Sequence, residues 1–374
     1  MKKLLAMMLC IALVLSLAAC SSTPAPPADD DDGDPVAAPV RVCNLINGNL
    51  GDLSFFDSAE NGMKMLKDEF GAAIVIDTVE MSYDTTKWEP SLLDACEEGY
   101  DVVICGTWQM TEFIEKIADQ YPEVAFILYD TSVNWTAGEF KNVHCIEYKQ
   151  NEGSYLVGVL AASISETGKL GFVGGLDNDV IKDFLVGYVE GAKSVNPDIQ
   201  ISVSYVGNFN DSATGKDLAL GQFGKGVDVN YGCAGQAGLG MFEAAVENGG
   251  KDAGIICIGV DSDQGMIFMD QGETAKAEIT PTSMLKRVDI SLYGAVKDYV
   301  NGTLSFGSTD FVGMAEGCIG LAENELYTTI VSEEVRAVVS EASAKLQSGE
   351  VTCGTAFGLS IEDYNAMVAA VALK

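Results

Sequence analysis

The stretch from Asp101 to Asp130, DVVICGTWQMTEFIEKIADQYPEVAFILYD, contains the pattern that decides the fold. Its Asp101–Cys105 and Val124–Tyr129 segments are short apolar runs rich in Val and Ile, which is typical of buried strands. Between them, Thr111–Gln120 has the length and spacing of an amphipathic helix. A strand, a helix and a second strand over about 30 residues predict a βαβ unit with parallel strands.

The same alternation extends in both directions from this unit. Strands are expected earlier at Val40–Leu45 and Ala73–Val79, and the rhythm restarts after Tyr148 and continues to Val260. Two successive α/β blocks, in a chain long enough for two domains, predict two doubly wound parallel-sheet lobes. Ligands of such sheets bind beyond the carboxyl ends of the strands, so we expect a shared cleft between the lobes.

The first twenty residues have the layout of an export signal. Lys2 and Lys3 precede the apolar run Leu4–Ala19, which is shorter than the ~20 residues that a membrane-spanning helix needs. Cys20 follows directly after two alanines, as in a bacterial lipobox. We interpret residues 1–19 as a lipoprotein signal peptide and Cys20 as the site of lipid attachment, with an ordinary secretory signal as the alternative.

Residues 20–39 have the composition of a tether. They include five prolines and the run Asp29–Asp32, and they show no apolar periodicity. Such a segment cannot bury enough apolar surface to fold, so we expect a disordered, acidic and proline-rich spacer. A cation site at the aspartates is the less favoured interpretation. With the lipid anchor, the tether predicts a protein held on the extracytoplasmic face of the cell membrane.

Charge and residue types exclude several functions. The formal net charge is −33, and removing residues 1–19, which carry two lysines, makes it −35. A field of this sign repels nucleic acid and anionic lipid, and it favours a neutral or cationic small molecule. His144 is the single histidine and no cysteines form a CxxC pair, so we expect no metal, no cofactor and no histidine-based catalysis.

An aromatic loop follows the first predicted strand. The segment Asn47–Ala59 turns through glycines into Asp52 and then into Phe55 and Phe56. Asp57-Ser58 is expected to cap the helix that follows. Two phenylalanines in a polar loop fit neither a strand nor a helix pattern. They could be tucked into the core, but we favour an aromatic platform in the cleft.

Other strand ends carry comparable residues. Phe209 lies in the polar turn Gly207–Asp211, Asp130 and Asp261 each follow an apolar strand, and Gly235 belongs to a glycine-containing strand end. One acidic strand end could be a simple helix cap. Several of them at the carboxyl ends of parallel strands predict a ligand site.

Six segments together resemble a known family. In order along nearly the whole folded region, they are Gly51–Phe55, Asn151–Gly158, Gly171–Gly175, Phe209–Asp211, Gly259–Gln264 and Thr282–Asp289. They are similar to the basic membrane protein family, whose members are lipoprotein substrate-binding components of ABC importers. The resemblance implies a type I periplasmic-binding-protein fold and capture of a nucleoside, with a purine base expected. It also implies delivery to an ABC permease and no enzymatic activity.

The resemblance implies roles for residues on both sides of the cleft. Phe55 and Phe209 would stack on the two faces of the base. Asp52 and Asp130 would be polar contacts from the first lobe, and the glycines around Gly235 would let the backbone approach the ligand.

Two further residues, Asp261 and Lys286, would hold the ribose hydroxyls. In isolation, Lys286 is better interpreted as a surface lysine, but its place after Thr280–Thr282 favours the cleft. The sequence departs from the family at Phe56, where asparagine is common, and at Gly106–Gln109. Both departures lie on the first lobe, where the resemblance places the base. The resemblance therefore supports ribose recognition more strongly than the identity of the base.

The resemblance also implies a hinge with three crossovers. They are expected near Tyr148–Gln150, Thr280–Thr282 and Phe311–Leu321. The N-terminal lobe would then comprise residues 40–148 plus about 282–315, and the C-terminal lobe 149–281 plus about 316–374.

Two other kinds of function remain open. The same scaffold could bind a sugar, riboflavin or a signal molecule that a sensor kinase reads. A hydrolase could use paired carboxylates, such as Asp52 with Asp130 or Asp261 with Asp263. We disfavour the hydrolase because no nucleophile and base accompany these acids.

Overall fold

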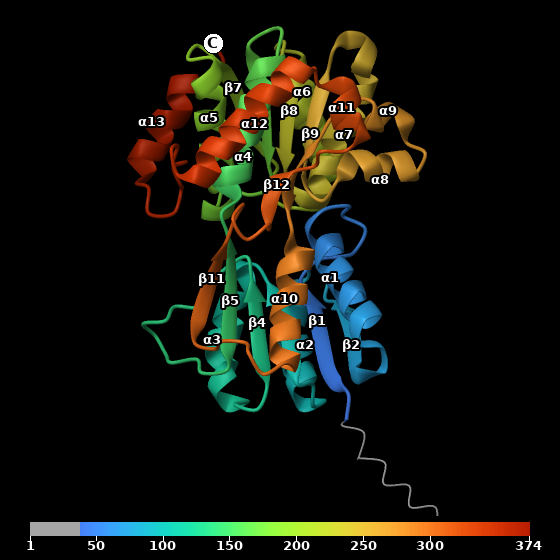
Figure 1. Ribbon diagram of the computed structural model, residues 1–374, viewed down its shortest axis with the longest axis vertical. Helices are drawn as coiled ribbons and strands as arrows, with labels where there is room; N and C mark the ends of the chain where they lie inside the picture. The colour runs from blue at the N-terminus through green and yellow to red at the C-terminus, as the bar shows by residue number, and fades with distance from the viewer. Residues whose placement is uncertain (1–37) are drawn as a thin grey trace, which may run out of the picture. The chain divides into compact units, whose positions relative to one another are not determined.

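The computed structural model describes residues 38–374 (Figure 1). The predicted signal peptide 1–19, the lipid attachment site Cys20 and nearly all of the predicted tether 20–39 lie outside these residues. The described chain contains two six-stranded sheets, each with helices on both faces. Within residues 38–374, no helix combines the length and the hydropathy needed to cross a membrane.

The first lobe has the sheet order β11-β5-β4-β3-β1-β2, and all neighbouring strands are parallel. Alternate side chains of this sheet face opposite helix layers, with α1 and α10 packed on one face and α2 and α3 on the other. The elements of this lobe are β1 (Val40–Ile46), α1 (Phe55–Phe70), β2 (Ile74–Glu80), α2 (Trp88–Glu97), β3 (Val102–Gly106), α3 (Thr111–Ile117), β4 (Ala125–Tyr129), β5 (Val143–Tyr148), α10 (Val288–Val300) and β11 (Ser308–Val312).

The second lobe has the order β12-β10-β9-β8-β6-β7, parallel except for β12, which runs antiparallel to β10. Helices α4 and α5 cover one face, and α6 and α7 cover the other. The elements are α4 (Gln150–Ile164), β6 (Lys169–Gly174), α5 (Asp179–Val195), β7 (Gln200–Tyr205), α6 (Ser212–Phe223), β8 (Val229–Cys233), α7 (Leu239–Glu247), β9 (Ile256–Asp261), α8 (Gln264–Asp270), α9 (Thr274–Ala277), β10 (Ser283–Lys286), β12 (Ile319–Leu321), α11 (Glu325–Ile330), α12 (Glu333–Ser348) and α13 (Ile361–Val371).

Helices α4 and α5 approach each other at the level of their backbones. A Cβ atom on Gly158 would lie 2.2 Å from the carbonyl oxygen of Tyr188, and one on Gly191 would lie 1.9 Å from that of Tyr155. Only glycine fits at these two positions. The glycines of this part of the sequence therefore serve helix packing next to the hinge.

Helix α1 begins at Phe55, and its cap differs from the one that the sequence predicts. Its inward face buries Phe56, Met63 and Leu66. The expected cap at Asp57-Ser58 is wrong because both residues lie in the first helical turn. The capping carboxylate belongs to Asp52, whose bonds are described below.

Three connections link the lobes in Figure 1: β5 to α4, β10 to α10, and β11 to β12. The second lies later than the crossover that the sequence places at Thr280–Thr282. Ser283–Lys286 forms β10, which pairs with β9 in the second sheet, so the chain leaves that lobe only after Lys286. A four-residue strand is too short to give a periodic signal, and its partner strand defines it.

Candidate functional site

A cavity lies where loops and strand ends of the two lobes meet; we call it the ligand cavity. The space in it amounts to about 700 Å³, including a part open to solvent. Its walls include all eight residues that the sequence places at a ligand site. These are Asp52, Phe55, Phe56, Asp130, Phe209, Gly235, Asp261 and Lys286.

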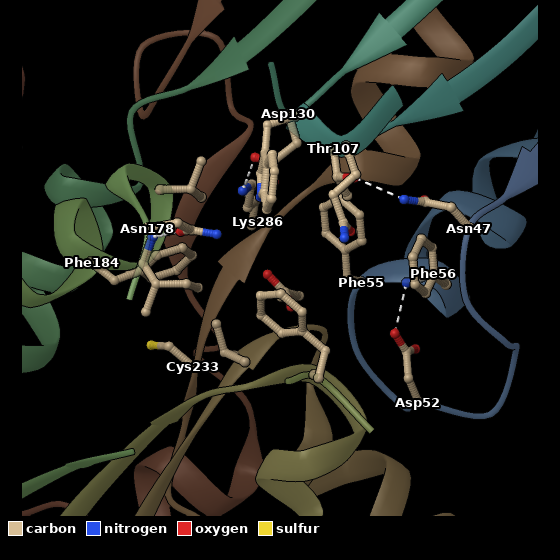
Figure 2. Close-up of a pocket in the computed structure, with 18 of the residues that line it drawn as sticks. Asn47, Asp52, Phe55, Phe56, Thr107, Asp130, Asn178, Phe184, Cys233 and Lys286 are labelled. Atoms are coloured by element: carbon tan, nitrogen blue, oxygen red, sulfur yellow. Dashed lines mark hydrogen bonds and ion pairs between the residues drawn. The ribbon is translucent and has the colours of Figure 1, made fainter. Parts of the chain in front are cut away.

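Lys286 lies at the end of β10 with only 1 % of its surface exposed. Its ammonium group donates to a carboxylate oxygen of Asp130, the contact drawn as a dashed line in Figure 2. The ammonium also lies 5.5 Å from the ring centre of Phe55 and 4.8 Å from that of Tyr148. The alternative of a surface lysine is therefore wrong.

Asp130 and Asp261 directly follow or end their strands, and both have a left-handed backbone conformation, with φ of 64° and 65°. Few non-glycine residues adopt this conformation, although aspartate does so more readily than most. Burial raises the pKa of both carboxyl groups, to about 6 for Asp261, while the charge of Lys286 opposes the rise. One buried cation therefore acts on both carboxylates, through a direct contact with Asp130 and through its charge alone on Asp261.

Contacts across the lobes lie beside these acids. The Ser54 hydroxyl, at the start of α1, donates to Oδ2 of Asp261 over 2.5 Å. The Ser262 hydroxyl donates to the Ser54 carbonyl oxygen over 3.0 Å. With a longer bond of 3.4 Å from the Ser54 hydroxyl to the Val260 carbonyl oxygen, three hydrogen bonds join the loop before α1 to the end of β9.

Phe55 and Phe56, which the sequence suggests to be loop residues, are the first two residues of α1, and both line the cavity. The Phe55 ring stacks on Tyr129, with centroids 5.4 Å apart and an angle of 29°. Phe56 is 6 % exposed and meets Phe55 edge to face. A Cβ on Gly48 would lie 2.2 Å from the Phe56 ring, so this phenylalanine requires glycine in the turn.

Phe209 approaches the cavity from the second lobe. A Cβ on Gly175 would lie 2.3 Å from its ring, and the backbone N–H of Ala237 donates to its carbonyl oxygen over 2.9 Å. Gly235 has φ of 53° and lies next to the Phe209 side chain. Two glycines thus leave room for the ring at the second lobe's wall.

Asp52 acts mainly within its own loop. Its carboxylate accepts backbone hydrogen bonds from Ser54, Phe56 and Asp57 at 2.9–3.1 Å. Burial nevertheless raises its pKa to about 7. With both oxygens already accepting, Asp52 positions the Phe55–Phe56 pair, and its implied role as a ligand contact is secondary.

The cavity has further walls that the sequence analysis did not select. Asn47 and Thr107 follow β1 and β3, and their side chains are hydrogen-bonded over 2.9 Å (Figure 2). The rule that ligands bind beyond strand ends could have found both. No comparable signal marks Asn178 and Phe184, which come from the start of α5. Trp108 also lines the cavity while 48 % exposed.

Metal binding is not indicated by this geometry. Within residues 38–374, no group of three or more His, Cys, Asp or Glu side chains is arranged to hold a metal ion.

Comparison with known proteins places this geometry in a family. The profile of the Bmp family, described as ABC transporter substrate-binding protein PnrA-like, matches residues 40–352. The CD4+ T-cell-stimulating antigen of Listeria innocua is 30 % identical over 360 residues, which cover 93 % of this chain and 96 % of the relative. The ABC transporter nucleoside-binding protein BmpA of Lactococcus lactis is 30 % identical over 326 residues, covering 84 % and 88 %.

Solved structures agree with these relatives. An ABC transporter solute-binding protein from Aeropyrum pernix K1 superposes with a TM-score of 0.76 at 28 % identity, covering 90 % of this chain and 100 % of the other. A myo-inositol binding protein from Caulobacter shares the fold, with a TM-score of 0.58 at 13 % identity and coverage of 80 % and 97 %. The predicted fold of two α/β lobes, that of type I periplasmic-binding proteins, is confirmed. The chain belongs to the Bmp family of ABC transporter substrate-binding proteins, which are extracytoplasmic binding proteins and not enzymes.

Proposed function

We propose that the protein captures a nucleoside, with a purine as the preferred base, and presents it to an ABC permease. The observation that carries the proposal is the composition of the ligand cavity. Two phenylalanines from different lobes, Phe55 and Phe209, line it together with the charged group of Asp130, Asp261 and Lys286. Flat aromatic surfaces suit a heterocyclic base, and paired charges suit the hydroxyls of a sugar. The relative from Lactococcus lactis is named as a nucleoside-binding protein.

The expected energies agree with a scavenging receptor. Stacking on an aromatic ring contributes ~1–3 kcal/mol per base face. Hydrogen bonds from hydroxyls to charged groups contribute about 1.5–3 kcal/mol each. Loss of motional freedom on binding costs several kcal/mol. A net binding free energy of about −8 to −11 kcal/mol corresponds to dissociation constants from micromolar to nanomolar.

Lobe closure is the proposed mechanism of capture. A ligand that contacts both lobes stabilises the closed arrangement over an open one in which only one lobe is contacted. The hydrogen bonds from Ser54 to Asp261 and from Ser262 to Ser54 support this, since opening would break them. Small-angle scattering should show a smaller radius of gyration with the nucleoside than without it; an unchanged radius would contradict closure.

The proposal includes anchoring through the N-terminus. Lipid attached at Cys20 would hold the receptor at the membrane, and the tether would let the binding domain reach its permease. Mass spectrometry of the protein from its native membrane should detect a diacylglycerol-modified Cys20 as the first residue. An unmodified N-terminus would contradict this part of the proposal.

Isothermal titration tests the ligand class. The panel contains purine and pyrimidine nucleosides, the free bases, ribose and riboflavin. We expect the tightest binding for a purine nucleoside and weaker binding for its free base and for ribose alone, because each of these loses half of the contacts. The proposal is overturned if no nucleoside produces heat. Binding of riboflavin or of a sugar alone would select the alternative specificities.

A further inference from the structure

A second cavity adjoins the ligand cavity, and we call it the adjoining cavity. Its space amounts to about 860 Å³, including a part open to solvent. The two cavities share Trp108, Asp130, Asn178 and Val180 as walls, so they lie next to each other. The inference below rests on the proposed nucleoside function.

The adjoining cavity is acidic, and Lys286 balances only one of its carboxylates, that of Asp130. Besides Asp130, the carboxylates of Glu147 and Asp179 line it. Among residues 38–374, no lysine or arginine lines the adjoining cavity. Neither Glu147 nor Asp179 forms an ion pair with any of these residues. Lys286 reaches Asp130 from the side of the ligand cavity. Burial and repulsion from Asp130 raise the pKa of Glu147, as expected for a carboxylate without a positive partner.

A buried amide in the same wall has an unused acceptor. Gln150 is 1 % exposed, and its Nε2 donates to Oδ2 of Asp183 over 2.7 Å. This bond to a carboxylate fixes the orientation of the amide, because only the nitrogen can donate. The Oε1 atom has no hydrogen-bond partner among the described residues. The wall therefore contains a buried acceptor that lacks a donor, and an unmet buried acceptor is costly.

Aromatic rings complete the adjoining cavity. Tyr148 lines it together with two rings that are substantially exposed, Trp108 at 48 % and Phe357 at 44 %. Aromatic faces attract organic cations within about 6 Å, most strongly where water is displaced. The Tyr148 ring already has one ammonium group beside it, since Nζ of Lys286 lies 4.8 Å from its centre.

We propose that the adjoining cavity binds an organic ammonium group, carried by the sugar side of the bound nucleoside. Carboxylates, an unmet acceptor and aromatic faces all favour a positively charged donor, and none of them favours an anion. Asp130 is both a wall of the adjoining cavity and a proposed sugar contact, so the substituent extends from the sugar. The same charges reject a phosphate at that position.

The ammonium group can come from two sources, and the experiment separates them. It can be part of the nucleoside, or it can belong to a separate amine that occupies the cavity beside an unmodified nucleoside. Isothermal titration would compare adenosine, 5′-amino-5′-deoxyadenosine, 3′-amino-3′-deoxyadenosine and adenosine monophosphate. Putrescine would be titrated separately, with and without adenosine.

We expect one of the amino nucleosides to bind at least fivefold more tightly than adenosine, and the monophosphate at least tenfold more weakly. Glu147→Gln keeps the shape of the side chain and removes its charge. This variant should lose most of the increase in affinity that the amino nucleoside has over adenosine, while its affinity for adenosine itself stays unchanged. Asp179→Asn, at an exposed position, is the second test variant if Glu147→Gln does not fold. Glu123 is an exposed carboxylate outside both cavities, so Glu123→Gln is the matched control. It should change neither the affinity for adenosine nor that for the amino nucleosides.

The outcomes separate this inference from the proposed function. If adenosine binds, no amino nucleoside binds more tightly than adenosine, and putrescine does not bind, the inference is overturned and the proposed function stands. If only putrescine binds, and Glu147→Gln removes that binding, the cavity holds a separate amine. If no nucleoside binds, the proposed function fails, and the putrescine titration alone decides whether the cavity recognises an ammonium group.

Discussion

Each lobe brings one phenylalanine to the ligand cavity, Phe55 at the first residue of α1 and Phe209 in the turn before α6, and an aspartate caps the loop before each helix. In the first lobe, Asp52 accepts three backbone hydrogen bonds around the first turn of α1. In the second lobe, Asp211 accepts from the backbone and the hydroxyl of Thr214 in α6. The capping chemistry is the same.

The two caps differ in burial, and burial reverses their pKa shifts. Asp52 is 2 % exposed, and burial raises its pKa to about 7. Asp211 is partly exposed, and the hydrogen bonds from Thr214 lower its pKa. The hydrogen bonds of a cap therefore do not by themselves set the ionisation of its carboxyl group. The first loop is fixed by a carboxylate that titrates near neutrality, whereas the second is fixed by one that stays ionised.

The largest expected effect comes from removing the buried cap. Asp52→Ala leaves three backbone N–H groups without their acceptor, two of them buried. We expect the free energy of unfolding to fall by about 2–4 kcal/mol. Asp211→Ala is the matched variant. Its free energy of unfolding should fall by less than half as much, because water can replace the carboxylate at this partly exposed position. Urea unfolding measures both, and equal losses would contradict the comparison.

The next effect is a pH dependence that only the first cap produces. Because the folded state raises the pKa of Asp52 from 3.8 to about 7, the folded protein holds a proton that the unfolded chain releases. This contribution to stability is therefore lost as the pH rises from about 4 through 7. For Asp211, whose pKa is lowered, the contribution is present above 3.8 and is lost as the pH falls below it.

Thermal or urea unfolding at pH 5 and pH 7 tests this difference. Relative to Asp52→Asn, which does not titrate, the wild type should lose about 2 kcal/mol of stability between these two pH values. Asp211→Asn should follow the wild type over the same interval. A pH profile of Asp52→Asn that is parallel to the wild type would show that Asp52 is not the titrating group.

The smallest effect concerns the rings themselves. Phe209→Ala should weaken nucleoside binding by tenfold or more, which is about 1.4 kcal/mol and within the range for one stacked face. Phe55→Ala should cost at least as much, since its ring also stacks on Tyr129 beside Lys286. Titration of a bound purine nucleoside measures both, with the exposed Phe306→Ala as the control. Unchanged affinity would remove the substituted ring from the site.

Much of the fold could be predicted because it depends on local patterns. Apolar runs such as Val124–Tyr129 predict buried strands, and their alternation with helices predicts parallel sheets. Strand β5 was missed, because His144 and Glu147 interrupt its apolar pattern. Strand β10 was missed because its four residues follow a threonine and proline pair that has the composition of a linker.

Much of the cavity wall could also be predicted, for a topological reason. Parallel strands bring their carboxyl ends to one side of a sheet, so Asp130 and Asp261 could be selected without knowing any contact. The adjoining cavity could not be predicted. It combines the end of β5, the start of α5 and Phe357 from a loop before α13, which share no sequence pattern.

The sequence by itself determined the two α/β lobes and the side of each sheet on which a ligand binds, because periodicity and strand direction are local properties. The tertiary structure alone decided which partners the charged residues have and how deeply they are buried. Lys286 meets Asp130 across 156 positions of the chain, and Ser54 meets Asp261 across 207. Packing turns an ordinary lysine into the buried ion-pair partner of Asp130, and burial turns a loop aspartate into a cap whose pKa is raised to about 7. Both outcomes depend on desolvation, which exists only once distant segments have packed together.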